Sequence, residues 1–386
     1  MEKIVFYVHR TGLLSYFVNP ICSFLCQKYK IYIFHIDKRN GYTYASGSTH
    51  FFETIDISDK SINEINSILC ELKPKAFVSL GFISIFELLM LRIAKQNGIK
   101  TIYLEHGLYS KETASLPFGK LIHNFFQTVR KNLFFLRRYY QFAKSSGAFK
   151  YEMSVFWRCI CKKEYYLSKF DQAMFFAEYG REQIGKLFKY EDNEVEYIGY
   201  PIAKTDVEFN VYSGIRNTPL PEGKKATYIH QPFILDGLSK WSYEEERNYL
   251  IKIANLLKEY GYSFSIQLHP RSNISTYRHL FSETGIELQQ GMERSDFKKY
   301  SLVVGHYSTA LLYPVFFNIP VMLIDYPNVC TKEDSVFSSI SCSLPIEDFC
   351  SLKDKYVEFC RKYIGSGICS FENIAQKLTD TIDQFN

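Results

Sequence analysis

The feature that most constrains the fold of this chain is a regular alternation of strand-like and helix-like runs. In the first half, apolar or β-branched runs predict strands over residues 3–9, 31–36, 76–80 and 101–104. Amphipathic stretches predict helices over residues 13–29, 61–72 and 83–97. Alternation of this kind predicts βαβ units with right-handed crossovers, and therefore a parallel, Rossmann-like sheet.

A second alternation begins after residues 210–225, a polar stretch with Gly and Pro that is typical of a linker. Strands are predicted over residues 226–229, 263–268, 302–304 and 321–324. We expect a first domain over 1–209, a second domain over 210–365 and a C-terminal helix over 366–386. The first domain should carry a basic, aromatic helical insertion at about 113–169. A chain of 386 residues is long enough for two cores of common size.

Composition and cysteine spacing indicate an ordinary globular protein. The chain is 46% hydrophobic and 23% charged, with a net charge of +5. Its ten cysteines are scattered, and the closest pair, Cys159 and Cys161, forms neither a CxxC motif nor a metal-ligand array. No window of ~20 apolar residues predicts a spanning helix, and the N-terminus does not resemble a signal peptide. We therefore expect a cytoplasmic protein that needs no metal or other cofactor.

Chemistry-bearing residues follow three of the predicted strands. Glu105-His106-Gly107 follows the strand at 101–104, His269-Pro270 follows 263–268, and Ser308-Thr309 follows 302–304. Open α/β sheets bind ligands at the carboxyl ends of their strands. The sequence therefore predicts a site made of one carboxylate, imidazoles and hydroxyls, in a cleft between two domains.

Ser308 and Thr309 precede a run that predicts a helix from Ala310 onward. Unpaired backbone N–H groups and two hydroxyls at a helix start offer a site for a phosphate, with His306 beside them. An ordinary helix N-cap is the alternative. His269 lies at a strand end, where Pro270 fixes the backbone that follows. Its imidazole could donate a hydrogen bond to a departing phosphate as that phosphate gains charge.

Glu105 is the candidate general base of the first half. A carboxylate at that strand end could take the proton from an attacking hydroxyl, whereas a helix-capping or salt-bridged acid is the alternative. His106 competes for the role, because the pKa of imidazole lies closer to cytosolic pH. Gln231 and Asp236 lie in the loop after residues 226–229. They either contact the bound ligand or only shape a turn.

The order and placement of these motifs resemble the bacterial sialyltransferases and polysialyltransferases of GT-B fold. Those enzymes use an acidic-acidic-Gly motif, a His-Pro motif and a Ser/Thr pair on CMP-sialic acid without metal. Here His106 stands in place of the second acid. The resemblance implies an α/β, GT-B architecture with two Rossmann-like domains facing a central cleft, namely an acceptor domain over 1–209 and a nucleotide-sugar domain over 210–365. It also implies that Glu105 is the general base, that His269 binds the CMP phosphate, and that Ser308 and Thr309 hold that phosphate. The other residues that we expect to contact the donor are Pro270, His306, Gln231 and Asp236.

The expected function is inverting, metal-independent transfer of sialic acid, or a related nonulosonic acid, from its CMP conjugate to a surface glycan of a capsule or lipopolysaccharide. Several alternatives remain open. A CDP-alditol-dependent polyol-phosphate transferase of teichoic acid type carries similar His-Gly and His-Pro pairs. A CMP-Kdo transferase, a UDP-sugar epimerase and a non-catalytic glycan-binding protein are the others.

The basic, aromatic insertion suggests an anionic partner. Ten Lys and Arg residues lie between Thr113 and Lys163, and Glu152 is the single acid. Arg130, Lys131, Arg137 and Arg138 are the residues that we expect to contact an anionic glycan acceptor or the inner leaflet of the cytoplasmic membrane. Capsule-assembly proteins would be further partners there. A solvated helical face is the ordinary alternative. No recognisable nucleic-acid module accompanies the segment, so nucleic acid is not expected.

Overall fold

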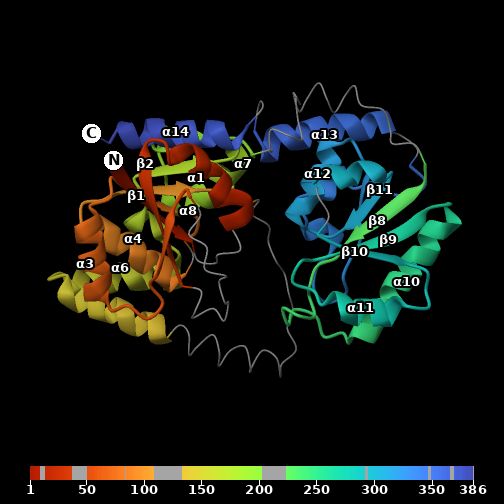
Figure 1. Cartoon of the computed structure of the whole chain (residues 1–386), viewed down its shortest axis with the longest axis horizontal. Coiled ribbons are helices and arrows are strands. Elements are labelled where there is room, and N and C mark those ends of the chain that lie inside the picture. Colours follow the sequence, from red (N-terminus) through yellow and green to blue (C-terminus); the bar gives the residue numbers. More distant parts are fainter. Residues whose placement is uncertain are drawn as a thin grey trace. The chain divides into compact units, whose positions relative to one another are not determined.

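The structure is a computed structural model, and it describes residues 1–8, 14–36, 50–82, 84–107, 133–201, 223–291, 294–346, 349–365 and 369–385. These residues form two compact units (Figure 1). Unit 1 contains the described residues of 1–201 and 363–385, and unit 2 contains those of 223–362. The boundary predicted at residue 210 lies outside the described residues.

Unit 1 is built on a parallel sheet with the strand order β3-β2-β1-β4-β5-β6-β7. The strands are β1 (Glu2–Val8), β2 (Tyr29–His35), β3 (Glu53–Asp56), β4 (Ala76–Ser79), β5 (Lys100–Leu104), β6 (Gln172–Phe175) and β7 (Val195–Tyr197). Every neighbouring pair runs parallel, which confirms the predicted Rossmann-like sheet. Strand β3 was not predicted, because this edge strand has acids at both ends and no apolar run.

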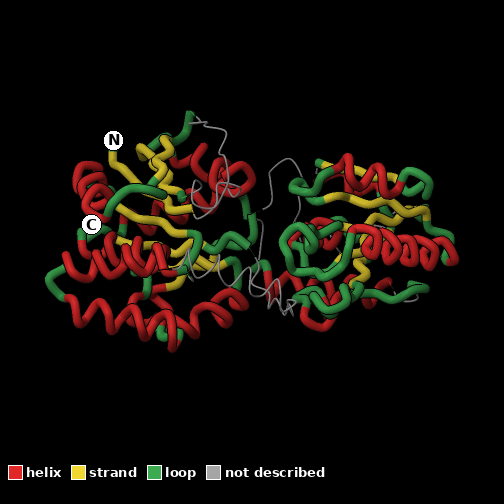
Figure 2. The backbone as a smooth tube through the Cα atoms, turned by 90° about the horizontal axis from the view of Figure 1, so that it is seen from below, coloured by secondary structure: helices red, strands yellow, loops and turns green. Residues whose placement is uncertain are grey.

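Helices pack on both faces of this sheet, as Figure 2 shows. They are α1 (Asn19–Leu25) after a π-helical turn η1 (Leu14–Val18), α3 (Ile62–Leu72), α4 (Ile85–Gln96), a helix over 133–145, α6 (Phe149–Lys162), α7 (Glu178–Gly180), η3 (Arg181–Gly185), α8 (Lys186–Phe188) and α14 (Phe371–Asp383), with short turns η2 (Tyr165–Ser168) and η4 (Asp192–Glu194). Ser61 and Ser84 start α3 and α4 with complete capping boxes. These boxes satisfy backbone N–H groups that a helix start leaves unpaired.

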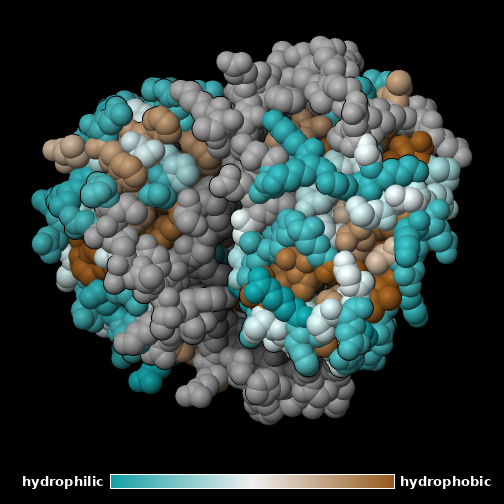
Figure 3. Space-filling model, turned by 45° about the vertical axis from the view of Figure 1, so that its right-hand side comes forward, coloured by the Kyte–Doolittle hydropathy of each residue, from teal (hydrophilic) through white to brown (hydrophobic). Residues whose placement is uncertain are grey.

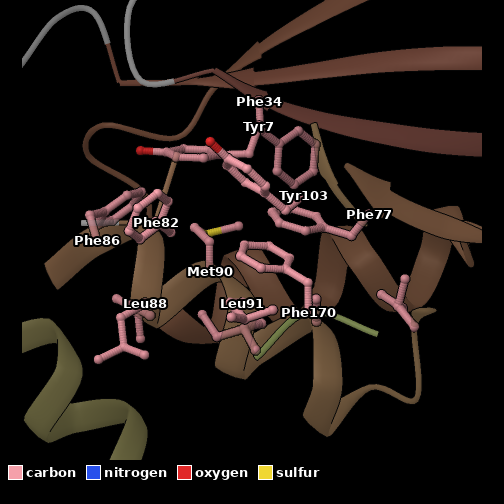
Figure 4. Close-up of a cluster of buried hydrophobic side chains, with 14 of the residues drawn as sticks. Tyr7, Phe34, Phe77, Phe82, Phe86, Leu88, Met90, Leu91, Tyr103 and Phe170 are labelled. Carbon is pink, nitrogen blue, oxygen red and sulfur yellow. The ribbon is translucent and has the colours of Figure 1, made fainter. Parts of the chain in front are cut away.

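The strands of unit 1 send alternate side chains into two cores. In β1, Val5 and Tyr7 belong to one core cluster, whereas Ile4, Phe6 and Val8 belong to the other. The first cluster is rich in aromatic rings that pack against α4 (Figure 4). The second includes a stripe of α14, namely Ile374, Leu378 and Ile382. The C-terminal helix is therefore part of the core of unit 1.

Unit 2 has a parallel sheet with the order β10-β9-β8-β11-β12. Its strands are β8 (Lys225–Ile229), β9 (Ser263–Leu268), β10 (Glu287–Gln290), β11 (Leu302–Gly305) and β12 (Val321–Leu323). Its helices are α10 (Tyr243–Glu259), α11 (Ile274–Phe281), α12 (Leu312–Phe316) and α13 (Phe349–Tyr363), with short 3₁₀ turns η5 (Arg294–Lys299), η6 (Thr309–Leu311), η7 (Lys332–Asp334) and η8 (Ser338–Ile340). Hydrophilic side chains separate small hydrophobic patches on the face drawn in Figure 3. The polar edge strand β10 was not predicted.

In each sheet the strand order reverses at one point. The reversal falls between β1 and β4 in unit 1, and between β8 and β11 in unit 2. Ligands of open α/β sheets bind outside the carboxyl ends of the strands at such a point. The loops that follow these strands are therefore where functional side chains are expected.

Candidate functional site

The three predicted segments of unit 2 leave the same edge of its sheet. Strands β8 and β9 pair with Ile229 opposite Gln267, so Gln231 and His269 lie at the same level two residues further on. Strand β11 pairs with β8 through Val304 and Tyr228 and ends at Gly305. The His269-Pro270 turn and the loop before Thr309 therefore emerge beside the loop that carries Gln231.

His269 is held as a neutral hydrogen-bond donor. Its Nδ1 accepts a hydrogen bond from the backbone N–H of Arg271 at 3.1 Å. Burial and the neighbouring Arg271 cation lower the pKa of this half-buried imidazole. An accepting Nδ1 carries no proton, so the proton of the neutral ring lies on Nε2. Nε2–H is the group that His269 can offer to an anion.

The turn around His269 is held by one side chain from the edge of the sheet and by a backbone hydrogen bond. The amide of Gln290, on β10, donates to the carbonyl of His269 at 3.0 Å and to that of Ser272 at 2.8 Å. The backbone N–H of Ser272 also donates to the carbonyl of His269 at 2.9 Å. These bonds fix the backbone on which the imidazole stands.

Asp236 and Gln231 have different surroundings, although both were predicted to touch the donor. The carboxylate of Asp236 accepts two hydrogen bonds from the guanidinium of Arg271, at 2.6 and 2.8 Å. This bidentate pair connects the loop after β8 to the His269 turn. Oε1 of Gln231 is buried and has no hydrogen-bond partner within the described part of the chain. Among those residues, that oxygen is an unsatisfied acceptor.

Ser308 is an N-cap, as the structural alternative predicted. Its Oγ accepts a hydrogen bond from the backbone N–H of Ala310 at 3.3 Å, at the start of η6. The expected helix begins as this single 3₁₀ turn and continues as α12 from Leu312. A hydroxyl that accepts a bond keeps its own proton to donate. Ser308 is half-buried and Thr309 exposed, so both hydroxyls can still donate.

His306 is placed inside unit 2, against the prediction that it contacts the donor. Its Nε2 lies 2.8 Å from the hydroxyl of Tyr228, and its Nδ1 lies 2.7 Å from the carbonyl of Ile324. A carbonyl only accepts, so Nδ1 carries the proton and Nε2 accepts from Tyr228. Burial lowers the pKa of His306 to about 4. Because both nitrogens have partners, His306 supports the loop from within and we leave it out of the phosphate site.

Glu105 is a buried carboxyl group in unit 1. It follows β5 and is 2% exposed. Its Oε2 accepts a hydrogen bond from the backbone N–H of Phe176 at 2.5 Å. Burial raises the pKa of Glu105 to about 8, and the bond from Phe176 opposes that rise. A base with a pKa near the working pH is well matched to proton transfer.

His106 is a weaker base than the sequence suggested. Burial lowers its pKa to about 4, while a bond with the backbone of Leu80 opposes the shift. Its Nδ1 is buried with no partner among the described residues, and its ring lies edge-on to Phe17 with centroids 6.4 Å apart. The expectation that imidazole has the pKa nearer to neutrality is therefore reversed, because burial shifts the acid upward and the imidazole downward.

The four residues predicted to form a basic surface do not share one environment in the structure. Arg130 and Lys131 lie outside the described residues, and Arg137 is exposed. Arg138 is buried, where its guanidinium donates to the carbonyl of Lys60 and lies over the ring of Phe134 at 4.6 Å. Arg138 therefore stabilises the fold, and its prediction as a surface contact is wrong.

Comparison with known families decides what kind of protein carries these residues. Residues 35–326 match the family model described as Alpha-2,8-polysialyltransferase (POLYST). The chain belongs to this family. The match includes all three motifs, from Glu105 to Thr309, and confirms the family expected from them. The chain is therefore a glycosyltransferase. No curated protein matches it.

Solved structures show the fold of this polysialyltransferase-family protein. CalG4, the calicheamicin glycosyltransferase, is 10% identical with a TM-score of 0.54, over 100% of this chain and 98% of that one. The UDP-GlcNAc 2-epimerase of Methanocaldococcus jannaschii, in complex with UDP-GlcNAc and UDP, is 13% identical with a TM-score of 0.51, over 98% and 100%. The wall teichoic acid polymerase TagF is 14% identical with a TM-score of 0.50, over 99% and 88%. With the two parallel sheets, these likenesses confirm the predicted GT-B fold.

Behind the His269 turn lies a buried polar network that sequence reasoning missed. The carboxylate of Glu246, on α10, accepts from the hydroxyls of Tyr277 at 2.6 Å and Tyr326 at 3.0 Å. His230 places Nε2 2.9 Å from the Tyr277 hydroxyl and Nδ1 3.3 Å from Oγ of Ser272. The chain Glu246-Tyr277-His230-Ser272 thus reaches the segment that carries His269.

The sequence pattern around Glu246, the acid of this network, predicts that its side chain is buried. Glu246 precedes Leu250, Ile253 and Leu257 at helical spacing, so it occupies the buried stripe of α10. Burial raises the pKa of Glu246, and bonds with His230, Tyr277 and Tyr326 offset this, so that the pKa lies below its ordinary value. An acid on an apolar stripe predicts such a paired, buried carboxylate.

Metal-type clusters and membrane-spanning helices are not found in the part of the chain that the structure describes. Its His, Cys, Asp and Glu side chains form no group of three or more suited to hold a metal ion. None of its helices combines the length and the apolar character that crossing a bilayer requires. Metal-independent catalysis stays a prediction.

Proposed function

We propose that this glycosyltransferase is an inverting, metal-independent enzyme that moves sialic acid, or a related nonulosonic acid, from its CMP conjugate to a hydroxyl of a surface glycan. The observation that carries the proposal is the tautomer of His269, whose Nε2–H is available at the carboxyl edge of the unit 2 sheet. Membership of the alpha-2,8-polysialyltransferase family supports the choice of donor.

In this proposal unit 2 holds the CMP part of the donor. Nε2–H of His269 and the hydroxyls of Ser308 and Thr309 donate to the phosphate as the glycosidic bond breaks and the phosphate gains charge. Donors aimed at developing charge stabilise the transition state more than the ground state. Pro270 keeps the turn in place. Oε1 of Gln231 accepts a bond from an N–H or O–H group of the donor.

Glu105 of unit 1 acts as the general base. Its carboxylate takes the proton of the acceptor hydroxyl while that oxygen attacks the anomeric carbon. The bond from the anomeric carbon to the phosphate oxygen breaks with its electron pair, CMP leaves, and the configuration inverts. A positioned base of this kind contributes about 10²- to 10⁴-fold in rate.

The proposed setting is the synthesis of a capsule or lipopolysaccharide at the inner face of the cytoplasmic membrane. The proposed acceptor is an anionic glycan, and capsule-assembly proteins are the proposed protein partners. Four basic residues were predicted to contact the acceptor or the membrane. Of these, Arg137 is both described and exposed, and it supports this setting.

An assay of nucleotide release tests the proposal directly. Purified protein is incubated with an oligosialic acid acceptor and with CMP-sialic acid, CDP-glycerol or UDP-GlcNAc, and the released nucleotide is measured. We expect acceptor-dependent CMP release from CMP-sialic acid alone. Release of CMP from CDP-glycerol would instead assign the site to a polyol-phosphate transferase. Loss of UDP-GlcNAc without an acceptor would indicate an epimerase.

A further inference from the structure

Two neighbouring helices of unit 1 present regular exposed stripes. In the helix over 133–145 the exposed positions are 133, 137, 140, 141, 144 and 145, and in α6 they are 149, 150, 151, 154, 157, 161 and 162. Both helices lie side by side at the edge of unit 1 (Figure 1), and the rings of Tyr140 and Phe149 meet with centroids 5.3 Å apart. We call the exposed residues from 133 to 163 the hairpin surface.

The hairpin surface is unusually rich in apolar and aromatic side chains. It carries five of the eleven large apolar residues that are exposed in the described part of the chain, namely Leu133, Tyr140, Phe149, Tyr151 and Trp157. Their exposed fractions run from 39% for Phe149 to 59% for Trp157. Aromatic side chains that stand in water at helical spacing indicate a surface that is covered in use.

The charges on the hairpin surface are all positive. Its exposed charged residues are Arg137, Lys144, Lys150, Lys162 and Lys163. The acid within this segment, Glu152, is buried and accepts two hydrogen bonds from Arg92 of α4, at 2.6 and 3.0 Å. The surface therefore combines cations and aromatic rings without an exposed carboxylate.

We propose that the hairpin surface docks the protein on an anionic lipid membrane. Trp and Tyr favour the boundary between lipid headgroups and acyl chains, and Lys and Arg are attracted to anionic headgroups. A glycan chain would match the charge, but sugar recognition relies on polar groups that converge in a concave site. Here the side chains stand on the outward faces of two helices. This inference concerns a surface other than the catalytic residues and does not depend on which donor the enzyme uses.

Co-sedimentation of the full chain with vesicles tests the inference. We expect binding to vesicles that contain phosphatidylglycerol and little binding to pure phosphatidylcholine. Each basic residue contributes about fivefold to such binding, so Lys150→Glu with Lys162→Glu should lower the partition constant ~25-fold or more. Trp157→Ser should weaken binding as well. The matched control is Lys252→Glu with Lys258→Glu on α10, which should bind like the wild type.

Separate measurements distinguish docking from misfolding and from glycan binding. The thermal unfolding midpoint and transfer to a soluble acceptor should be unchanged in the hairpin variants. Equal binding to both kinds of vesicle, or normal vesicle binding by the double variant, would overturn the inference. Intact vesicle binding with lost affinity for oligosialic acid would assign the surface to the glycan. Vesicle binding by a chain that transfers no sugar would support docking and count against the proposed function alone.

Discussion

The carboxylate of Glu105 lies directly over Gly180, because a Cβ on residue 180 would stand 2.6 Å from Oε2 of Glu105. Gly180 ends the short helix α7, and the backbone N–H of Phe176 binds the same carboxylate oxygen at 2.5 Å. The missing side chain of Gly180 therefore leaves space for the proposed base, and the N–H of Phe176 helps to set its orientation.

The first prediction concerns this space. Gly180→Ala should displace the Glu105 carboxylate and lower kcat by about 10- to 100-fold, since small misplacements of a catalytic group are costly. The measurement is steady-state transfer from CMP-sialic acid. Gly185→Ala is the control, because its Cβ would meet only the flexible side chain of Arg181, at 3.1 Å. Full activity of Gly180→Ala would mean that Glu105 does not act from its observed position.

The second prediction concerns pH. If Glu105 is the base, kcat/KM should rise with pH and level off above about 8, the pKa to which burial raises this group in the free enzyme. The rise should be absent in the residual activity of Glu105→Gln. A rise centred near pH 4 would instead point to His106, whose pKa lies at about 4.

The free energy of unfolding should also depend on the pKa of Glu105, but it should fall as pH rises, whereas activity should rise. Between the ordinary pKa of 4.5 and the folded value of about 8, the folded state holds a proton that the unfolded state has lost. The stabilising contribution is therefore complete below pH 4.5 and is lost as pH rises toward 8. It is worth on the order of 1.4 kcal/mol per unit of pKa shift. Urea unfolding at several pH values should show this decline in the wild type and a weaker one in Glu105→Gln.

A third prediction addresses the buried network of unit 2. Glu246→Ala leaves His230 and two tyrosine hydroxyls without their shared acceptor, and should reduce the free energy of unfolding by about 3–5 kcal/mol. Glu246→Gln keeps the shape and should cost less. Glu244→Gln is the control on the exposed face of the same helix, with an expected change within about 0.5 kcal/mol. Equal stability of the Glu246 and Glu244 variants in urea would show that the network does not contribute to the free energy of unfolding.

The fourth prediction separates two roles for Asp236. If Asp236 acts by holding Arg271, then Asp236→Ala, Arg271→Ala and the double variant should raise the KM for the donor by similar factors, since each breaks one bidentate pair. The pair is partly exposed, so its effect on stability should be only about 0.2–1 kcal/mol. Additive effects of the two single variants on KM would indicate that Asp236 contacts the donor directly.

The sequence predicted most strands and both sheets because buried parallel strands carry long apolar runs, as β1 does. It missed β3 and β10, where the residues at the sheet edge are acids and amides. A C-terminal helix was expected over 366–386, and α14 lies within that range. Its packing against unit 1 depends on contacts far away in the sequence, which local periodicity does not encode.

The sequence predicted the positions of the candidate site residues better than it predicted their surroundings. Placing polar residues after strands located Glu105, His269 and Ser308 at strand ends of the expected kind. Other predicted residues have surroundings that the sequence did not reveal. His306 and Arg138 look like accessible polar groups in the sequence, but each is enclosed and bonded within its unit. Only tertiary packing makes that distinction.

Turnover of CMP-sialic acid by His269→Ala is the most direct test of the central claim, that His269 donates from Nε2 to the departing CMP phosphate. The account predicts that kcat falls ~10²-fold or more, with a far smaller change in KM, since the interaction strengthens only in the transition state. His279→Ala, an exposed histidine on α11, should keep wild-type kcat. Undiminished kcat in His269→Ala would contradict the account.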